Sequence, residues 1–128
     1  MVLTDLPVYL PALLQNIEAN QHGLAGRVSA LGLDWKEAVP PSLAASADMV
    51  IVCDCIYYEA SLQPLIDTIL ALMKPEAQVI LAYERRADKL ELYDQFFSLM
   101  EKYFSTTVIL NTKTGGRNDI FLLELRLL

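Results

Sequence analysis

One short segment of the sequence places an acidic side chain directly after a strongly apolar run. Residues 49–59 read MVIVCDCIYYE, so Asp54 ends the run, and Tyr57 and Tyr58 follow three and four positions later. The hydrogen-bond ladder of a buried strand has no use for a carboxylate, which accepts hydrogen bonds but donates none. Either the segment reaches the surface at Asp54, or Asp54 binds something at the tip of the strand.

Polar or aromatic residues follow four strand-like segments in the same way. In an open α/β sheet, ligands bind beyond the carboxyl ends of the parallel strands, so these residues would meet along one rim. Strand ends also reach the surface in any protein, which accounts for polar residues at some of these positions. Together the four groups predict one binding crevice. They are Asp5, Asp34-Trp35, Cys53-Asp54 and Tyr83-Glu84.

The composition is that of a packed chain with one modest core. Of the 128 residues, 54% are hydrophobic and 20% are charged, and a chain of this length forms at most one domain. No apolar run reaches the roughly 18 residues of a membrane span. The net charge of −6 argues against a nucleic-acid-binding surface, which needs clustered lysine and arginine.

The cysteine and histidine content limits redox and metal chemistry. Cys53 and Cys55 are the only cysteines, and His22 is the only histidine. A disulfide between positions two apart would be strained, which favours reduced thiols and a cytoplasmic or also nuclear location. We expect no metal site, because a zinc site needs four ligands.

Hydrophobic periodicity predicts alternating strands and helices. The Gly115-Gly116 pair between the last two apolar segments marks an antiparallel hairpin. The order predicts an α/β fold whose sheet is mostly parallel and closes with this C-terminal hairpin. The expected strands cover residues 2–4, 27–31, 48–53, 77–83, 105–112 and 119–128, and the expected helices cover residues 7–21, 60–73 and 89–104.

Several of these segments carry a family resemblance. LTDLP with LLQNIEAN, LDW, CDCIYYEASLQPLI and AYERR resemble, in this order, motifs of the seven-β-strand protein-lysine methyltransferases of the methyltransferase-like 21 type. The resemblance runs from residue 2 to residue 127, and DCIYYE followed by SLQPL is its most specific part. It implies a Rossmann-like class I methyltransferase sheet and S-adenosylmethionine as methyl donor. The implied acceptor is a lysine of another protein, such as a chaperone or an AAA ATPase.

The resemblance implies three cofactor-binding residues. Asp5 resembles the acidic residue that accepts hydrogen bonds from the ribose hydroxyls, a task that suits the two oxygens of a carboxylate; its alternative role is to cap the next helix. Trp35 resembles a tryptophan at the adenine pocket, where an indole can stack on a purine; an ordinary half-buried tryptophan is the alternative. Cys53 occupies a position that is usually a small residue lining the cofactor site.

The resemblance also implies catalytic and substrate-binding residues. Asp54 and Tyr57 match the family's acidic-x-x-Tyr motif, which faces the target lysine. Attack requires the neutral amine, whereas free lysine has a pKa of about 10.4 and a carboxylate favours the ammonium. We therefore expect Asp54 to capture and aim the target lysine. We expect Tyr57 to line the channel through which the lysine enters, or to hold its amine. Tyr58, Tyr83 and Glu84 are the expected substrate contacts. In the alternative, Asp54 caps the helix near residue 60 and Tyr57 packs.

One part of the family pattern is missing from this sequence. The family fold begins with a first strand and a Gly-rich loop, and none of the five glycines forms Gly-x-Gly after a strand. We therefore expect one partial methyltransferase domain over residues 1–128, with weak or absent binding of S-adenosylmethionine, which calorimetry would test. The inner strand edges would close on each other or take a strand from a partner, or the chain would be poorly soluble and self-associate.

Three functions follow from these expectations. The leading one is a fragment or short form of an S-adenosylmethionine-dependent protein-lysine methyltransferase that carries the substrate-facing half of the site. The second is a non-catalytic protein-interaction module derived from such an enzyme, which the absent Gly-rich loop favours. The third and weakest is a methyltransferase with a small-molecule or nucleic-acid acceptor. A methyl-transfer assay with and without Asp54→Ala separates the first two.

Overall fold

The chain divides into two compact units, Met1–Glu37 and Ala38–Leu128. The computed structural model describes residues 1–23, 26–112 and 119–128. Strands and helices alternate along the chain in the predicted order. The prediction of a single domain over residues 1–128 stays a prediction. In the part of the chain that is described, no helix is long and apolar enough to cross a membrane.

The first unit is a two-stranded parallel sheet with one helix. Strand β1 (Val2–Asp5) pairs with β2 (Ser29–Gly32), and the register places Asp5 opposite Gly32. Between them lie η1 (Pro7–Tyr9), α1 (Leu10–Asn20) and η2 (Gln21–Gly23). A Cβ atom at Gly32 would lie 3.1 Å from the backbone of Pro7. Glycine therefore lets the chain that leaves β1 pass close to the end of β2.

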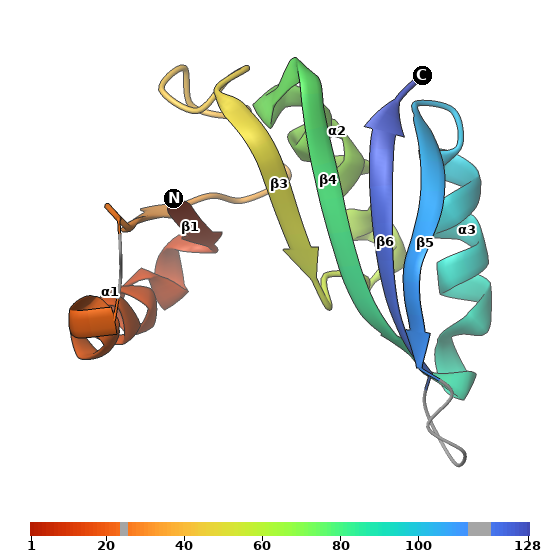
Figure 1. Ribbon diagram of the computed structural model, residues 1–128, viewed down its shortest axis with the longest axis horizontal. Helices are drawn as coiled ribbons and strands as arrows, with labels where there is room; N and C mark the ends of the chain where they lie inside the picture. Colours follow the sequence, from red (N-terminus) through yellow and green to blue (C-terminus); the bar gives the residue numbers. More distant parts are fainter. Residues whose placement is uncertain (24–25, 113–118) are drawn as a thin grey trace. The chain divides into compact units, whose positions relative to one another are not determined.

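The second unit is a mixed four-stranded sheet in the order β3-β4-β6-β5 (Figure 1). Its elements are β3 (Ala47–Cys53), η3 (Glu59–Ser61), α2 (Leu62–Leu72), β4 (Met73–Arg85), η4 (Ala87–Lys89), α3 (Leu90–Met100), β5 (Phe104–Thr112) and β6 (Asp119–Leu127). Strands β3 and β4 are parallel, and β6 runs antiparallel to both β4 and β5. Strands β3, β4 and β5 thus share one direction, which confirms a mostly parallel sheet with a C-terminal antiparallel pair. The turn predicted at Gly115-Gly116 lies outside the described residues.

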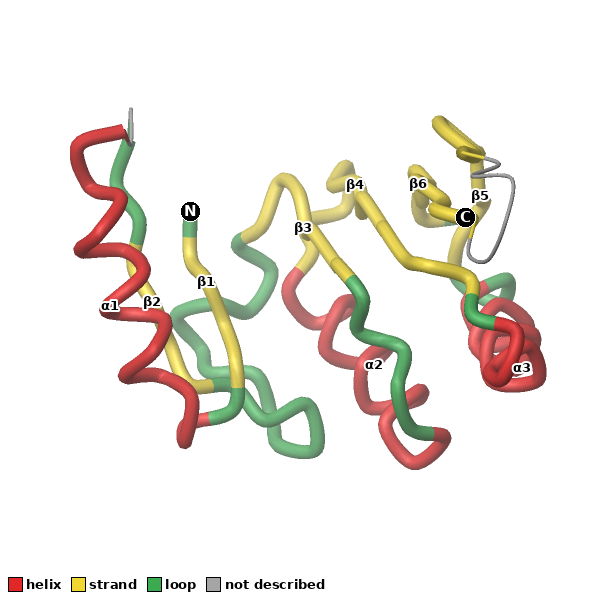
Figure 2. The backbone as a smooth tube through the Cα atoms, turned by 90° about the horizontal axis from the view of Figure 1, so that it is seen from below, coloured by secondary structure: helices red, strands yellow, loops and turns green. Residues whose placement is uncertain are grey.

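Helices α2 and α3 lie on the same face of this sheet (Figure 2). Alternate residues of a strand point to opposite faces, so Val79 and Leu81 of β4 face the helices and are fully buried. The other side chains that are fully buried come from both helices and from β6. They are Ile66, Ile69, Phe96, Met100 and Leu125. This layer forms the core of the unit, because burial of apolar surface is the main favourable contribution to folding.

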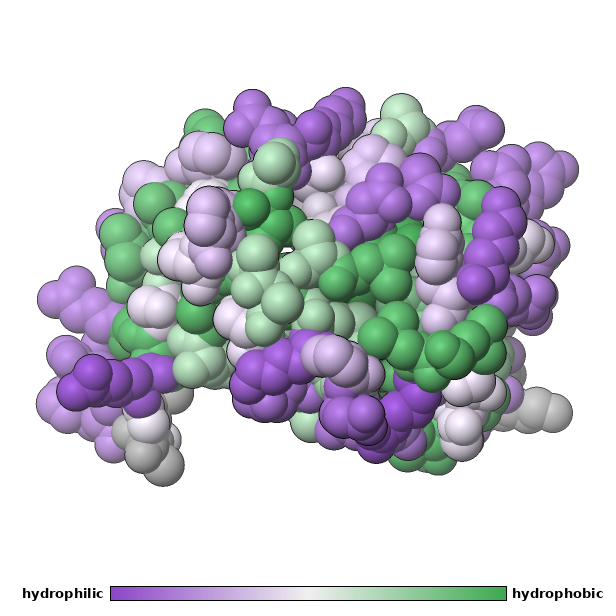
Figure 3. Space-filling view, turned by 90° about the horizontal axis from the view of Figure 1, so that it is seen from above, coloured by the Kyte–Doolittle hydropathy of each residue, from purple (hydrophilic) through white to green (hydrophobic). Residues whose placement is uncertain are grey.

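Apolar side chains also reach the surface among hydrophilic ones (Figure 3). On β3, Met49 and Ile51 alternate with the buried Val52 and are exposed. They therefore point to the sheet face opposite α2 and α3. Leu110 of β5 and Ile120 of β6 are exposed as well.

Candidate functional site

The candidate site lies where strand β3 ends. The last residue pair between β3 and β4 is Cys53 with Ala82. The next residue, Asp54, donates its backbone N–H to the carbonyl of Ala82 at 2.9 Å, and its Oδ1 accepts the backbone N–H of Glu84 at 3.1 Å. Just past the end of β3, the Asp54 carboxylate therefore accepts the β4 hydrogen bond that the backbone of a further strand residue would otherwise accept.

The backbone of Asp54 has a left-handed conformation. Its φ is 48°, and Asp54 is one of two non-glycine residues with positive φ in the described part of the chain. Asp and Asn tolerate this region better than other non-glycine residues do. Such backbone geometry is concentrated at functional sites, where the surrounding structure must hold it in place. Here one hydrogen bond donated to β4 holds the backbone of Asp54, and one accepted from β4 holds its side chain.

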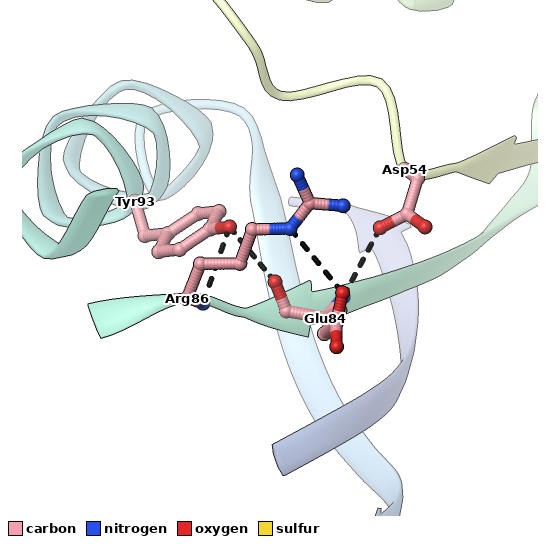
Figure 4. A network of polar contacts seen from close by, with 4 residues as sticks. All are labelled: Asp54, Glu84, Arg86 and Tyr93. Atoms are coloured by element: carbon pink, nitrogen blue, oxygen red, sulfur yellow. Dashed lines mark hydrogen bonds and ion pairs between the residues drawn. The ribbon is translucent and has the colours of Figure 1, made fainter. Parts of the chain in front are cut away.

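The hydroxyl of Tyr93, on helix α3, also binds the end of β4 (Figure 4). It donates to the carbonyl of Glu84 at 2.8 Å and accepts the backbone N–H of Arg86 at 3.4 Å. The Arg86 Nε in turn donates to Glu84 Oε2 at 3.2 Å. Asp54, Glu84, Arg86 and Tyr93 thus form one polar network.

A small pocket opens beside this network. Its volume is about 10 Å³, room for about one water molecule, and an amino group is of the same size. The pocket brings together three residues predicted from the sequence, Asp54, Tyr57 and Tyr83. The other lining residues are Ile56, Arg86, Lys89 and Tyr93. Arg86 belongs to the AYERR segment, for which the resemblance implies a position at the rim of the site or a solvated charge, and the sequence predictions gave no site role to the other three.

Tyr57 and Tyr58 differ in their places. Tyr57 lines the pocket, and its backbone carbonyl accepts a hydrogen bond from Lys89 Nζ at 3.3 Å. Burial, followed by the nearby Cys55 and Asp54 side chains, raises the pKa of the Tyr57 hydroxyl above its ordinary value of 10. Tyr57 therefore carries its proton at neutral pH and can donate a hydrogen bond. Tyr58 is 72% exposed and does not line the pocket.

Tyr83 belongs to an aromatic cluster. Its ring stacks on Phe121 at 5.2 Å between centroids and lies 5.2 Å from Tyr93 and 5.4 Å from Phe97. Tyr83 is buried, and burial raises the pKa of its hydroxyl above 10. Side chains from β4, β6 and α3 thus fix one wall of the pocket.

The raised pKa of Tyr83 makes the stability of the fold depend on alkaline pH. The folded state favours the protonated hydroxyl, so this contribution is present below about pH 10 and is lost as the pH rises through the higher folded pKa. When the pH is raised from about 8 to about 10.5, we expect the free energy of unfolding, measured in urea, to fall less in Tyr83→Phe than in the wild type. In Tyr103→Phe, which changes an exposed tyrosine, the free energy of unfolding should fall as much as in the wild type. An equal loss in Tyr83→Phe would contradict this assignment.

The predicted cofactor-binding residues lie at strand ends. Asp5 ends β1, and its Oδ1 accepts the N–H of Leu6 at 2.7 Å. Trp35 is half-buried just after β2. Cys53 ends β3 with an exposed side chain, and its carbonyl accepts a hydrogen bond from Cys55 Sγ at 3.3 Å. Their roles toward a cofactor stay predictions.

Both helix-capping alternatives are wrong. The N-cap residues of η1 and α1 are Leu6 and Tyr9, so Asp5 caps neither helix. The N-cap residues of η3 and α2 are Tyr58 and Ser61, so Asp54 does not cap the helix near residue 60. The carboxylate of Asp54 binds β4 instead.

Comparison with solved structures identifies the fold. The structure is similar to the PH0226 protein from Pyrococcus horikoshii OT3 (TM-score 0.71, 13% identity), of which the chain covers 71% with all of its own length. It is also similar to the N-methyltransferase NodS from Bradyrhizobium japonicum WM9 in complex with S-adenosyl-L-homocysteine (TM-score 0.69, 12% identity; 98% of this chain and 65% of NodS). P. horikoshii TYW2 in complex with MeSAdo gives a TM-score of 0.59 at 16% identity, over 98% of this chain and 47% of TYW2. The fold is therefore that of a class I methyltransferase.

The sequence identifies the family within this fold. Residues 1–103 match the lysine methyltransferase family. The match covers more than half of the chain, which therefore belongs to this family. The chain spans between about half and three quarters of the length of the solved structures named above.

Proposed function

We propose that the chain takes part in S-adenosylmethionine-dependent methyl transfer to the side-chain amine of a lysine in another protein. The observation that carries the proposal is the Asp54 carboxylate, which the Glu84 N–H holds at the tip of β3 beside an amine-sized pocket. Membership in the lysine methyltransferase family supports it.

The residues around the pocket suit the capture of a lysine amine. One Asp54 oxygen is bound to β4, and among the described residues the other has no hydrogen-bond partner, so it can accept from the amine. The protonated Tyr57 hydroxyl and ring form part of the wall. Arg86 and Lys89 also line the pocket. Positive charges nearby disfavour the ammonium and so offset the preference of Asp54 for it. Asp54 therefore aims an amine that its neighbours help to keep neutral.

The strand-end residues of the chain suit the cofactor chemically. When bound, S-adenosylmethionine supplies the electrophilic methyl group. Asp5 is exposed and uses one oxygen for the Leu6 N–H, which leaves the other able to accept from a ribose hydroxyl. Trp35 offers a half-buried ring that can stack on a purine. These two residues, both in the first unit, would hold the nucleoside.

An AAA ATPase is the first acceptor to test. Within the family, the DCIYYE and SLQPL segments resemble those of the enzyme that methylates the AAA ATPase valosin-containing protein. The experiment mixes the purified chain with tritiated S-adenosylmethionine and either recombinant valosin-containing protein or a recombinant chaperone. Because weak cofactor binding is expected, the cofactor concentration is raised until incorporation no longer increases.

The expected result is tritium in the acceptor protein, located on a lysine Nζ by mass spectrometry. Label on any other residue type would contradict lysine as the acceptor. An acceptor that binds the chain but receives no label would favour a non-catalytic interaction module over an enzyme.

A further inference from the structure

We propose that Tyr93 is a positioning residue for Asp54, acting through the backbone of Glu84. The inference rests on the proposed function, because it assigns Tyr93 a part in aiming the acceptor lysine. Tyr93 lines the pocket together with Asp54, but its hydroxyl binds the backbone of Glu84 and Arg86 and not the carboxylate. Its hydroxyl holds the peptide segment that holds the carboxylate.

The register of the sheet shows why Glu84 needs side-chain partners. Within a strand, the N–H and C=O of one residue point to the same side, toward one neighbouring strand. Strand β3 pairs with β4 only as far as Ala82, so at Glu84 it no longer offers backbone groups on that side. Asp54 Oδ1 takes the N–H of Glu84, and the Tyr93 hydroxyl donates to its C=O. The two side chains therefore bind the two backbone groups of one residue.

The position of Tyr93 makes it a rigid support. The residue is buried on α3, and its ring lies 5.2 Å from that of Tyr83, which packs against β6. Its hydroxyl also accepts the N–H of Arg86 at 3.4 Å, so it spans the segment from Glu84 to Arg86 where β4 ends. Helix α3 thereby fixes the direction of the Glu84 N–H, and this N–H fixes the Asp54 carboxylate.

Removal of the Tyr93 hydroxyl is the direct test. Tyr93→Phe keeps the ring and loses both hydrogen bonds. We expect labelled methyl transfer to fall about tenfold at saturating cofactor, the size of effect that a modest displacement of an aiming group produces. Tyr103→Phe, at an exposed tyrosine outside the site, should keep wild-type activity.

A double-mutant cycle separates positioning from a general structural role. If Tyr93 acts through Asp54, then Tyr93→Phe should lower activity less than about twofold once Asp54 is already asparagine. A full tenfold loss in that background would overturn the inference, because Tyr93 would then act independently of Asp54. If Asp54→Asn greatly lowers methyl transfer but Tyr93→Phe alone does not lower it, the role of Tyr93 is overturned. The proposed function remains intact in that case.

Hydrogen exchange gives a readout that needs no activity. In Tyr93→Phe the amide of Glu84 should exchange about tenfold faster, while the amides of β6 keep their wild-type rates. A uniform increase across the sheet would mean that the hydroxyl only stabilises the fold, and would overturn the inference. If Asp54→Asn transfers methyl groups like the wild type, the proposed function fails, whereas the exchange of Glu84 still reports the contact itself.

Discussion

Asp54→Asn is expected to lower methyl transfer to lysine about a hundredfold while the chain stays folded. Asparagine tolerates a φ of 48° as aspartate does, and its amide oxygen can accept the Glu84 N–H in place of Oδ1. The substitution therefore removes the negative charge and leaves the local backbone in place. Asp54→Ala would add backbone strain to the loss of charge, so asparagine gives the cleaner test.

The measurement is tritium incorporation into the acceptor at saturating cofactor, together with the melting temperature of each variant. Asp48→Asn is a matched control, because Asp48 lies on the same strand, is exposed and forms a surface ion pair with Lys74 at 2.7 Å. We expect it to retain activity, since such surface pairs contribute little. A misplaced aiming group lowers activity much more than twofold. If Asp54→Asn kept more than about half of the wild-type activity, Asp54 would therefore not be the group that aims the lysine.

Phe96→Ala is expected to have the largest effect on stability. Phe96 is fully buried on α3 beneath the sheet, and its ring meets that of Phe97 edge-on at 5.4 Å. Truncating such a side chain removes apolar burial and leaves a cavity, and the cost is about 3–5 kcal/mol. This is a large share of the roughly 5–15 kcal/mol by which domains are usually stable.

Urea unfolding followed by circular dichroism measures this change. Leu90→Ala is the matched control on the same helix, because Leu90 is exposed, and it should cost less than about 1 kcal/mol. Phe96→Leu should fall between the two and remain measurable if the alanine variant does not fold. A loss below about 1 kcal/mol in Phe96→Ala would show that α3 does not pack on the sheet as described.

The elements of the fold were predictable because their patterns are local. The apolar run before Asp54 predicted β3 almost to the residue, and the apolar stripe after Ala60 predicted α2. The boundary after α2 was less well predicted, since Lys74-Pro75 was expected to follow the helix and instead lies inside β4, which begins at Met73. Proline is tolerated near the start of a strand, where a ladder donor is not needed.

The partners of the site residues were not predictable in the same way. Asp54 was identified from its motif, but its bond to the Glu84 N–H depends on the register between β3 and β4, which no local pattern specifies. Tyr93 was missed, although it lies three residues before Phe96 and seven before Met100 on the buried stripe of α3. That spacing marks it as a core residue, and a buried tyrosine usually finds a hydrogen-bond partner.

The expected substrate contacts differ in their position relative to the pocket. Tyr83 lines it, whereas Tyr58 is largely exposed outside it, and the roles of both toward a substrate stay predictions. Arg86 and Lys89 come to the pocket because the chain turns between β4 and α3, which brings charged residues back beside Asp54. Such turns combine residues whose order along the chain gives no sign of their proximity.

A structure of the protein with a lysine-containing acceptor peptide and S-adenosyl-L-homocysteine would test the central assignment most directly. We predict that the lysine Nζ lies within about 3 Å of the Asp54 carboxylate, with Tyr57 beside it and the Glu84 N–H still bound to the other Asp54 oxygen. A lysine bound elsewhere, with no contact to Asp54, would contradict the account.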